Sequence, residues 1–372
     1  MIARKLVWLS IGASALVGSA CAQVPDLMNA LDAGGRAMGS GGSFYGTGSD
    51  TLSTYYNPAG LAFLTTSQIG AAYRNLPKSK TTTSGDTNDP VFSTKASAGG
   101  SEVTHAGFVT PFGKRGVLGL SYTLGGFIDD SLTGSTTDGS VTTNTSLHRK
   151  VRNDFYTLAY ASSKTDQTFS WGVGIQVIQS RLNYNLNQTD SLGGSIVRND
   201  SSTGTGEAFI AGVQFTPKTS PNTSFGLSYR SEANLSGNSD TADLLDKIPA
   251  RLLASIAYRQ DGFRGGRDFV VFGAQAQYFF SAANGHDFDR SSQTVGGFGV
   301  EYNYNSGSFR IPLRIGYNAT PSGGENFGDR NSFTFGIGYR PTNGRYSLDL
   351  NFANPQHGGY DVALSLNYKL GK

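Results

Sequence analysis

Apolar side chains alternate with small or polar ones in the stretch DVALSLNYKL, which covers residues Asp361–Leu370. A period of two places the two kinds of side chain on opposite faces of a β-strand. We expect one face to carry Val362, Leu364, Leu366, Tyr368 and Leu370, and the other to carry Ala363, Ser365, Asn367 and Lys369. The stretch predicts a strand with one apolar face, a pattern that fits both a soluble sandwich and a membrane barrel.

The same alternation returns from residue 67 onward, in segments of roughly ten residues separated by turn-rich stretches. It is clearest in FSWGVGIQV, residues Phe169–Val177. These segments predict about fourteen antiparallel strands, and an even number is the rule for bacterial barrels. Their approximate positions are 66–75, 102–111, 115–126, 151–162, 167–184, 204–216, 222–232, 249–260, 267–281, 292–304, 307–318, 330–340, 344–353 and 360–370.

The second face of these strands carries Gly, Ser, Asn and scattered amide or charged residues. In a membrane barrel that face lines the lumen, while the apolar face meets lipid. Tyr residues recur at the strand ends, as expected for aromatic girdles at the two membrane interfaces. The polar residues that we expect in the lumen are Gln176, Gln275, Gln277, Glu301, Arg310, Arg314 and Asp349.

The connections between these strands alternate between long and short. We expect long, solvated loops near 76–101, 127–150, 185–203, 233–248, 282–291 and 319–329, and short turns near 112–114, 163–166, 217–221, 261–266, 305–306 and 341–343. Only 354–359 is shorter than this rhythm predicts. Long external loops and short periplasmic turns produce such a rhythm, with both termini periplasmic, and a sandwich does not require it. The fold that we predict is all-β, a closed transmembrane barrel over residues 66–372.

The N-terminus has the features of a secretion signal over residues 1–22. Arg4 and Lys5 precede the apolar run Leu6–Ala20, and Ala20-Cys21-Ala22 supplies small residues at the cleavage position. The alternatives are an uncleaved membrane anchor, for which the run is short, and lipidation at Cys21. Together with the barrel pattern, this signal predicts the outer membrane of a diderm bacterium, with the lipid bilayer as a partner.

The rest of the composition excludes several classes of function. Without Arg4 and Lys5, 28 basic residues face 27 acidic ones, and a net charge near +1 predicts no nucleic-acid partner. Cys21 is the only cysteine, so we expect no disulfide and no cysteine-based metal or redox site in the mature protein.

Known catalytic motifs are absent from the sequence. It has no hydrolase elbow, no nucleotide-binding loop and no metal-ligand spacing of its four histidines, so we expect neither an enzyme nor a cofactor. Two weak alternatives remain, a cation contact at His286-Asp287-Phe288-Asp289 and an esterase built from dispersed residues.

Residues 23–65 do not follow the barrel pattern. They contain GGRAMGSGG, residues 34–42, and YYNPAGLA, residues 55–62. Dense glycine suits tight turns and close backbone approach, and Asn57-Pro58 favours the start of a turn. The segment also carries apolar residues that favour burial. We therefore predict a plug, or hatch, folded into the lumen, with a flexible periplasmic lead as the alternative.

These two motifs resemble the N-terminal signature of the FadL/TodX hydrophobic-compound transporters and of the related PorV/PorQ outer-membrane proteins. The resemblance covers residues 34–62 and implies a fourteen-stranded barrel with the segment inside it. It places in the hatch Gly34, Gly35, Arg36, Gly39, Asn57, Pro58, Ala59 and Gly60. The chain is shorter than the fatty-acid transporters and ends in Gly371-Lys372 instead of an aromatic residue. No ligand-binding residue is assigned.

The resemblance implies passive passage of small hydrophobic compounds, such as fatty acids and aromatic hydrocarbons, through a lumen gated by the hatch. In the transporter branch, ligands leave sideways through an opening in the barrel wall. In the other branch the barrel is an accessory of a secretion system, and its partners are secretion machinery or a cargo protein. The third hypothesis is a general structural barrel or porin.

Overall fold

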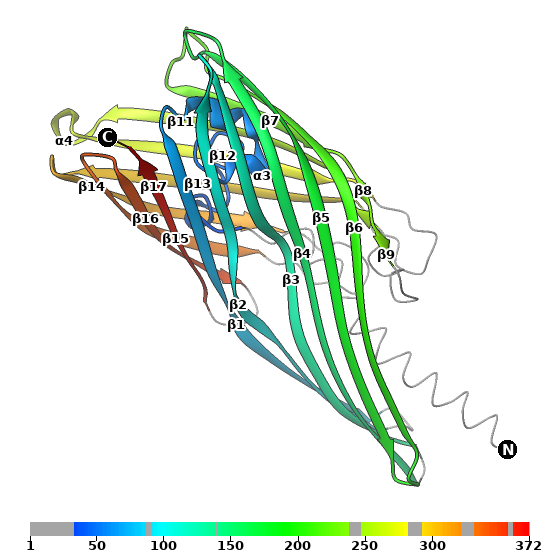
Figure 1. Ribbon diagram of the computed structural model, residues 1–372. Helices are drawn as coiled ribbons and strands as arrows, with labels where there is room; N and C mark the ends of the chain where they lie inside the picture. The colour runs from blue at the N-terminus through cyan, green and yellow to red at the C-terminus, as the bar shows by residue number, and fades with distance from the viewer. Residues whose placement is uncertain are drawn as a thin grey trace.

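The computed structural model describes residues 33–86, 91–138, 140–237, 247–281, 292–320, 331–355 and 360–371. Fourteen antiparallel strands form one closed barrel, as predicted (Figure 1). They are β1 (Ser67–Asp86), β2 (Val91–Phe112), β3 (Gly116–Asp138), β4 (Val141–Ser163), β5 (Phe169–Asp190), β6 (Ser195–Phe215), β7 (Thr223–Arg230), β11 (Arg251–Gly262), β12 (Asp268–Phe279), β13 (Gln293–Asn305), β14 (Phe309–Ala319), β15 (Ser332–Pro341), β16 (Tyr346–Pro355) and β17 (Asp361–Leu370).

Each strand pairs with its neighbours in sequence, and the ring closes between β1 and β17. That last ladder runs from Ser67 opposite Leu370 to Asn75 opposite Val362. Three short strands lie outside the ring: β8 (Ala233–Asn234) pairs with β10 (Lys247–Ile248), and β9 (Ser236–Gly237) pairs with β6. Closure gives every barrel strand a partner strand on each side, which is the condition for a sheet to cross lipid.

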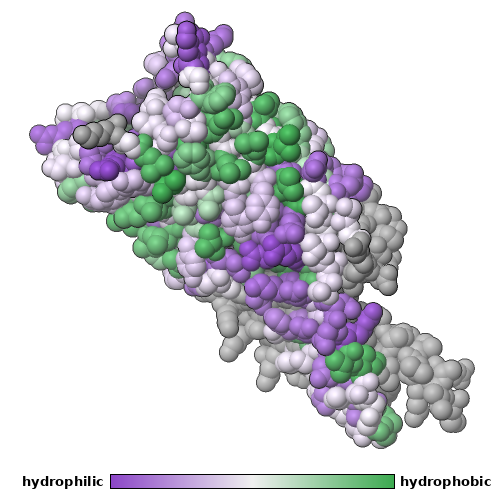
Figure 2. All heavy atoms as spheres, in the orientation of Figure 1, coloured by the Kyte–Doolittle hydropathy of each residue, from purple (hydrophilic) through white to green (hydrophobic). Residues whose placement is uncertain are grey.

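The alternation of side chains follows the prediction. In β17 the side chains of Leu364 and Leu366 are exposed outside the wall, while Ala363 and Ser365 are buried inside it. Exposed Phe, Ile, Leu and Tyr side chains recur on every barrel strand, whereas Gln176, Gln275, Gln277, Glu301, Arg314 and Asp349 are buried within. On the face shown in Figure 2, hydrophobic residues gather over the barrel strands. An apolar outside and a polar inside suit a protein surrounded by lipid.

The first six barrel strands are much longer than predicted. β1 to β6 have 20 to 23 residues each, and they extend the sheet far beyond the rest of the barrel (Figure 1). The prediction of solvated loops near 76–101, 127–150 and 185–203 is therefore wrong. Those stretches are rich in Thr, Ser and Asn, a composition that resembles a loop. Thr nevertheless fits a strand well, and each stretch forms the two paired arms of a β-hairpin.

The two faces of β5 exchange their polarity halfway along the strand. The outer face changes from Ile175 and Val177 to the polar Gln179 and Arg181, while the inner face changes from Gln176 to the buried Ile178. Lipid requires an apolar outer face, so this exchange marks the level at which β5 leaves the bilayer. The extended part of β1 to β6 therefore projects from the membrane on one side.

We call the opposite end of the barrel the short-turn end. The short turns predicted there are confirmed, including residues 113–115, 164–168 and 306–308 between barrel strands and the one-turn α4 (Phe263–Gly266). β1 begins at this end and β17 finishes there. Within the described ranges, no helix combines the length and the apolar character needed to cross a membrane. The predicted signal peptide, Cys21 and His286–Asp289 lie outside the described residues.

Candidate functional site

Residues 33–66 lie inside the barrel, and we call them the luminal segment. It contains η1 (Met38–Ser40), α3 (Ser53–Tyr56) and η2 (Pro58–Phe63), all short and almost entirely buried. Its polar contacts reach strands around the whole ring. Thr104 of β2 donates to the carbonyl of Ala33 at 2.7 Å, and Ser228 of β7 donates to that of Tyr56 at 2.5 Å. A segment that touches opposite sides of a closed wall occupies its lumen (Figure 1).

Glycines in the wall make room for this segment. A Cβ at Gly297 of β13 would lie 1.9 Å from the carbonyl oxygen of Gly41, and one at Gly226 of β7 would lie 2.0 Å from that of Gly46. Gly212 of β6 faces Asn57 in the same way. Because a Cβ cannot approach an oxygen so closely, these inward positions accept only glycine while the segment is in place. The glycines that alternate with aromatic residues in these strands are therefore explained by the close approach of the luminal segment to the inner face of the wall.

Asn57 fixes the turn before η2 and ties it to the wall. Its side-chain oxygen accepts a hydrogen bond from the amide of Ala59 at 3.2 Å, which caps η2, and Pro58 occupies the first position of that helix. The side-chain nitrogen of Asn57 donates to the carbonyls of Gly46 at 2.7 Å and of Val213 in β6 at 3.2 Å. Asn57 is completely buried. One amide therefore joins the segment's turn, its glycine-rich part and the wall.

Arg36 joins the other half of the segment to the opposite wall. Its Nε and Nη2 donate to the two carboxylate oxygens of Glu301 at 2.6 and 2.7 Å. Glu301 also accepts from Nε of Arg314 at 2.7 Å, and Arg314 donates from Nη2 to Asp349 at 2.6 Å. Bidentate pairs of this kind are among the strongest side-chain contacts. We call these four residues the ion network.

Gly34 and Gly35 lead into Arg36 with φ of +86° and +81°, a backbone conformation that other residues rarely adopt. The carbonyl of Gly35 accepts from Nδ2 of Asn351 at 2.9 Å. Gly39, the middle residue of η1, packs against Asn351 and Gly336. The predicted hatch residues thus fall into two groups. Gly35, Arg36 and Gly39 contact β13 to β16, whereas Gly34 lies beside β17, β1 and β2. Asn57 to Gly60 lie beside β4 to β6.

Apolar side chains gather in the lumen where the luminal segment faces the extended strands. The rings of Tyr45 and Tyr56 are stacked, and the ring of Tyr55 meets those of Tyr56 and of Phe155 in β4 edge-on. Together with wall residues of β4, β5 and β11 they form the luminal aromatic cluster, which includes Val151, Ile178, Leu182 and Leu253. A cluster of this kind inside a membrane barrel offers an apolar environment isolated from the bilayer.

Two arginines are buried in this cluster, side by side on β7 and β11. Arg230 and Arg251 face each other in the ladder, and each is only 2% exposed. The guanidinium of Arg251 lies 5.0 Å from the ring centroid of Tyr55 and donates to that residue's carbonyl at 2.8 Å. Among the described residues, neither arginine pairs with a carboxylate, and the Nε of each has no hydrogen-bond partner. Buried cations without a counterion are costly, so this arrangement favours an anionic ligand.

The ladder between β2 and β3 is interrupted. The strands pair over 91–98 with 130–137 and over 105–112 with 116–123, and no pair is formed between 99–104 and 124–129. Phe127 and Leu124 are buried at this interruption, and the ring of Phe127 lies against Gly100. The wall here is closed by side chains instead of backbone hydrogen bonds.

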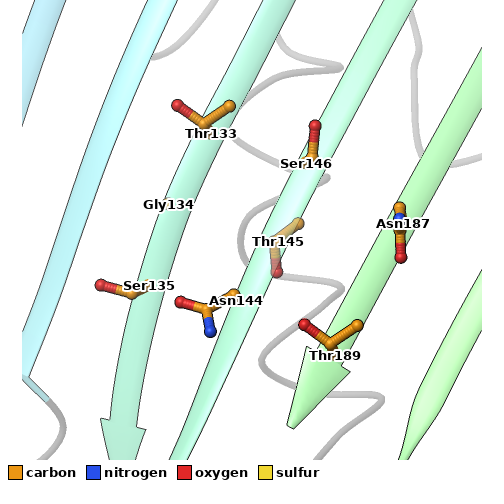
Figure 3. Close-up of a pocket in the computed structure, with 8 residues that line it drawn as sticks. All are labelled: Thr133, Gly134, Ser135, Asn144, Thr145, Ser146, Asn187 and Thr189. Carbon is orange, nitrogen blue, oxygen red and sulfur yellow. The ribbon is translucent and has the colours of Figure 1, made fainter.

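A recess on the extended strands has a different character. It has a volume of about 420 Å³ and is lined by Thr, Ser, Asn and Gly residues of β3, β4 and β5 alone (Figure 3). It has no charged or apolar side chain, and it lies outside the barrel proper. It therefore lacks the groups that would select a hydrophobic ligand.

Comparison with known proteins identifies the fold. No protein-family model and no curated protein matches the sequence. A solved FadL homologue of Pseudomonas aeruginosa aligns with a TM-score of 0.62 at 16% identity, over 90% of this chain and 98% of that one. The toluene transporter TodX of Pseudomonas putida aligns at 0.57 and 15% identity, over 93% and 100% of the chains. This chain has the fold of the FadL-type channels. The CymD monoaromatic hydrocarbon channel also aligns, at 0.52 and 13% identity, over 91% and 100%.

The FadL-type fold agrees with the resemblance inferred from the two N-terminal motifs. The names of the three solved structures describe channels or transporters, or a homologue of one, and no enzyme. Sequence reasoning missed Arg230 and Arg251, although the alternation of Phe225, Leu227 and Tyr229 on the outer face places Arg230 on the inner one. It placed Glu301 and Arg314 in the lumen without connecting either to Arg36, because no local signal links residues so far apart in the chain.

Proposed function

We propose that this barrel allows passive passage of small hydrophobic compounds across the outer membrane, and that amphipathic carboxylates such as fatty acids are its preferred ligands. The observation that carries this proposal is the pair Arg230 and Arg251 within the luminal aromatic cluster. The cluster suits an acyl chain, and the two guanidiniums supply donors for one carboxylate. TodX and CymD, which have the same fold, are a toluene transporter and a monoaromatic hydrocarbon channel.

The luminal segment would act as the hatch of this passage. It lies between the aromatic cluster and the short-turn end, so a ligand in the cluster cannot continue along the lumen while Arg36 and Asn57 keep their contacts. The short-turn end would face the periplasm, with the extended strands outside the cell. A ligand could pass when the segment moves, or leave sideways where the ladder between β2 and β3 is interrupted.

Uptake of two labelled compounds tests this function. Cells that lack their own hydrophobic-compound transporters would receive the gene, and uptake of dodecanoate and of toluene would be compared with that of cells without it. We expect dodecanoate uptake to rise, and Arg251→Met to lower it about tenfold, because one charge-assisted hydrogen-bonding partner is lost. Toluene carries no charge, so its uptake should not respond to Arg251→Met.

The controls separate folding from function. Arg115→Met, at an exposed turn of the short-turn end, should leave uptake of both compounds unchanged. The slower electrophoretic migration of unheated folded barrels would show that Arg251→Met still folds. Uptake equal to that of cells without the gene, for both compounds, would reject passage. Equal loss of dodecanoate and toluene uptake in Arg251→Met would reject the preference for carboxylates.

Pro58→Ala tests the hatch separately. Pro58 is buried at the first position of η2, beside Gly172 of β5, and its ring restricts the backbone of the turn. We expect Pro58→Ala to loosen the turn and raise the leak of a small sugar into liposomes that contain the purified protein. A leak indistinguishable from that of the wild type would favour a luminal segment that does not move.

The accessory role in secretion remains a second candidate because of the extended strands. β1 to β6 continue past the level at which the outer face of β5 becomes polar, and they would offer an extended sheet outside the membrane. This role predicts that a secreted cargo protein or a translocon copurifies with the barrel, and that deleting the gene mislocalises that cargo without changing uptake of either labelled compound.

A further inference from the structure

A second polar cavity lies at the short-turn end, lined by residues beside α4 and near the end of β17. Figure 1 labels these two elements. It has a volume of about 750 Å³, and the luminal segment forms its inner boundary through Phe63 and Leu64. Two carboxylates line it, Asp50 and Asp349. The cationic side chains that line it are Arg36, Arg259, Arg267, Arg310, Arg340 and Lys369. We call this cavity the arginine basin. It lies on the other side of the luminal segment from Arg230 and Arg251.

The positive charge of the basin is only partly neutralised. Arg36 pairs with Glu301 of the ion network, Arg340 lies 3.5 Å from Asp349, and Arg259 pairs with Asp261 outside the cavity at 2.7 Å. The side chains of Arg310 and Arg267 have no ion pair or hydrogen bond among the described residues. The basin thus combines a surplus of cations with few anions to balance them.

Arg310 and Arg259 lie against the same aromatic ring in the arginine basin, that of Phe269. The guanidinium of Arg310 lies 5.5 Å from the ring centroid of Phe269, and that of Arg259 lies 3.9 Å from the same centroid. The ring holds two like charges close together through cation–π contacts, although like charges repel each other. An anion placed between such guanidiniums would relieve the repulsion, and their planar donor groups match the oxygens of a carboxylate or a phosphate.

We propose that the arginine basin binds an oxyanion, a carboxylate or phosphate group that reaches it from the short-turn end, with Arg310 and Arg267 as its principal ligands. This site does not depend on passage of hydrophobic compounds through the lumen. Two sources could supply the anion: a free solute such as inorganic phosphate, or the head of an amphipathic carboxylate.

Calorimetric titration of the purified full-length barrel in a non-ionic detergent at low ionic strength tests the proposal. The probes are inorganic phosphate, dodecanoate and dodecanol. We expect saturable binding of at least one anionic probe, and a loss of about tenfold in affinity with Arg310→Gln or Arg267→Gln, because each removes a charge-assisted donor. Arg267 is exposed, so its substitution should not affect folding. Arg115→Gln, on another turn of the same end, should bind like the wild type.

Comparison of the three probes and the variants distinguishes the two sources of the anion. Phosphate binding that needs Arg310 identifies a site for free oxyanions. Binding of dodecanoate that needs Arg310, without binding of phosphate or dodecanol, identifies a site for an amphipathic carboxylate. Dodecanoate binding that is unaffected by both basin variants but lost in Arg251→Met would assign the anion to the aromatic cluster and overturn the proposal. Absence of saturable binding of either anion, or an equal loss with Arg115→Gln, would also overturn it.

Discussion

Replacement of Arg36 by methionine should release the first half of the luminal segment from the wall. The substitution keeps most of the length of the side chain but removes both hydrogen bonds to Glu301, at 2.6 and 2.7 Å. Breaking a buried ion pair by removing one partner costs roughly 3–5 kcal/mol. The side chain of Arg36 is 30% exposed and Glu301 keeps Arg314, so we expect about 2 kcal/mol.

A change of about 2 kcal/mol corresponds to roughly a thirtyfold shift in the equilibrium between the docked and the released segment. The barrel ladders do not involve Arg36, so the change should be local. Hydrogen exchange of the purified barrel, followed by mass spectrometry, would measure it. We expect faster exchange of peptides covering residues 34–46 in Arg36→Met and unchanged exchange in β1 to β17.

Two comparisons make this result decisive. Arg115→Met changes an exposed arginine of the short-turn end, and its exchange pattern should match that of the wild type. The double variant Arg36→Met with Glu301→Gln should cost less than the sum of the two single changes, because both remove the same pair. Unchanged exchange of residues 34–46 in Arg36→Met would refute the view that this ion pair holds the segment in the lumen.

Further predictions concern one wall glycine and one pair of turns. Gly297→Ala should displace the luminal segment and expose it to limited proteolysis, since the new Cβ would lie 1.9 Å from the carbonyl oxygen of Gly41. Gly296→Ala is the matched control, since no heavy atom lies within 4 Å of its added Cβ, and equal sensitivity of both variants would contradict the reasoning. At the short-turn end, a hydrogen bond from Lys218, together with two from Thr168, holds the pKa of Asp166 below its usual range. Lys218→Gln should raise that pKa in an NMR titration, and the contact in the wild type should be lost only as the pH falls through the lowered value; an unchanged pKa would refute the pairing.

Much of the fold was predictable because strand alternation is a local property of the sequence. The period of two in Phe169–Val177 and in Asp361–Leu370 predicts the face on which each side chain lies, whatever its partner strand is. The signal is weak for the extended strands, where Thr, Ser and Asn occur on both faces and resemble loops. The exchange of polarity between Val177 and Gln179 is visible in the sequence, but it is interpretable only once β5 is known to continue through it.

The candidate site was less predictable, because its contacts join distant parts of the chain. The sequence by itself determined a closed barrel with an apolar outer face, and a glycine-rich segment with an Asn57-Pro58 turn before it. Only the tertiary structure decided that Arg36 pairs with Glu301, and that Arg230 and Arg251 are buried together with no carboxylate partner in the part of the chain that the structure describes. The physical reason is that local periodicity determines on which face of a strand a side chain lies. The residue that this side chain contacts depends on the register between paired strands, which is set only when the barrel closes.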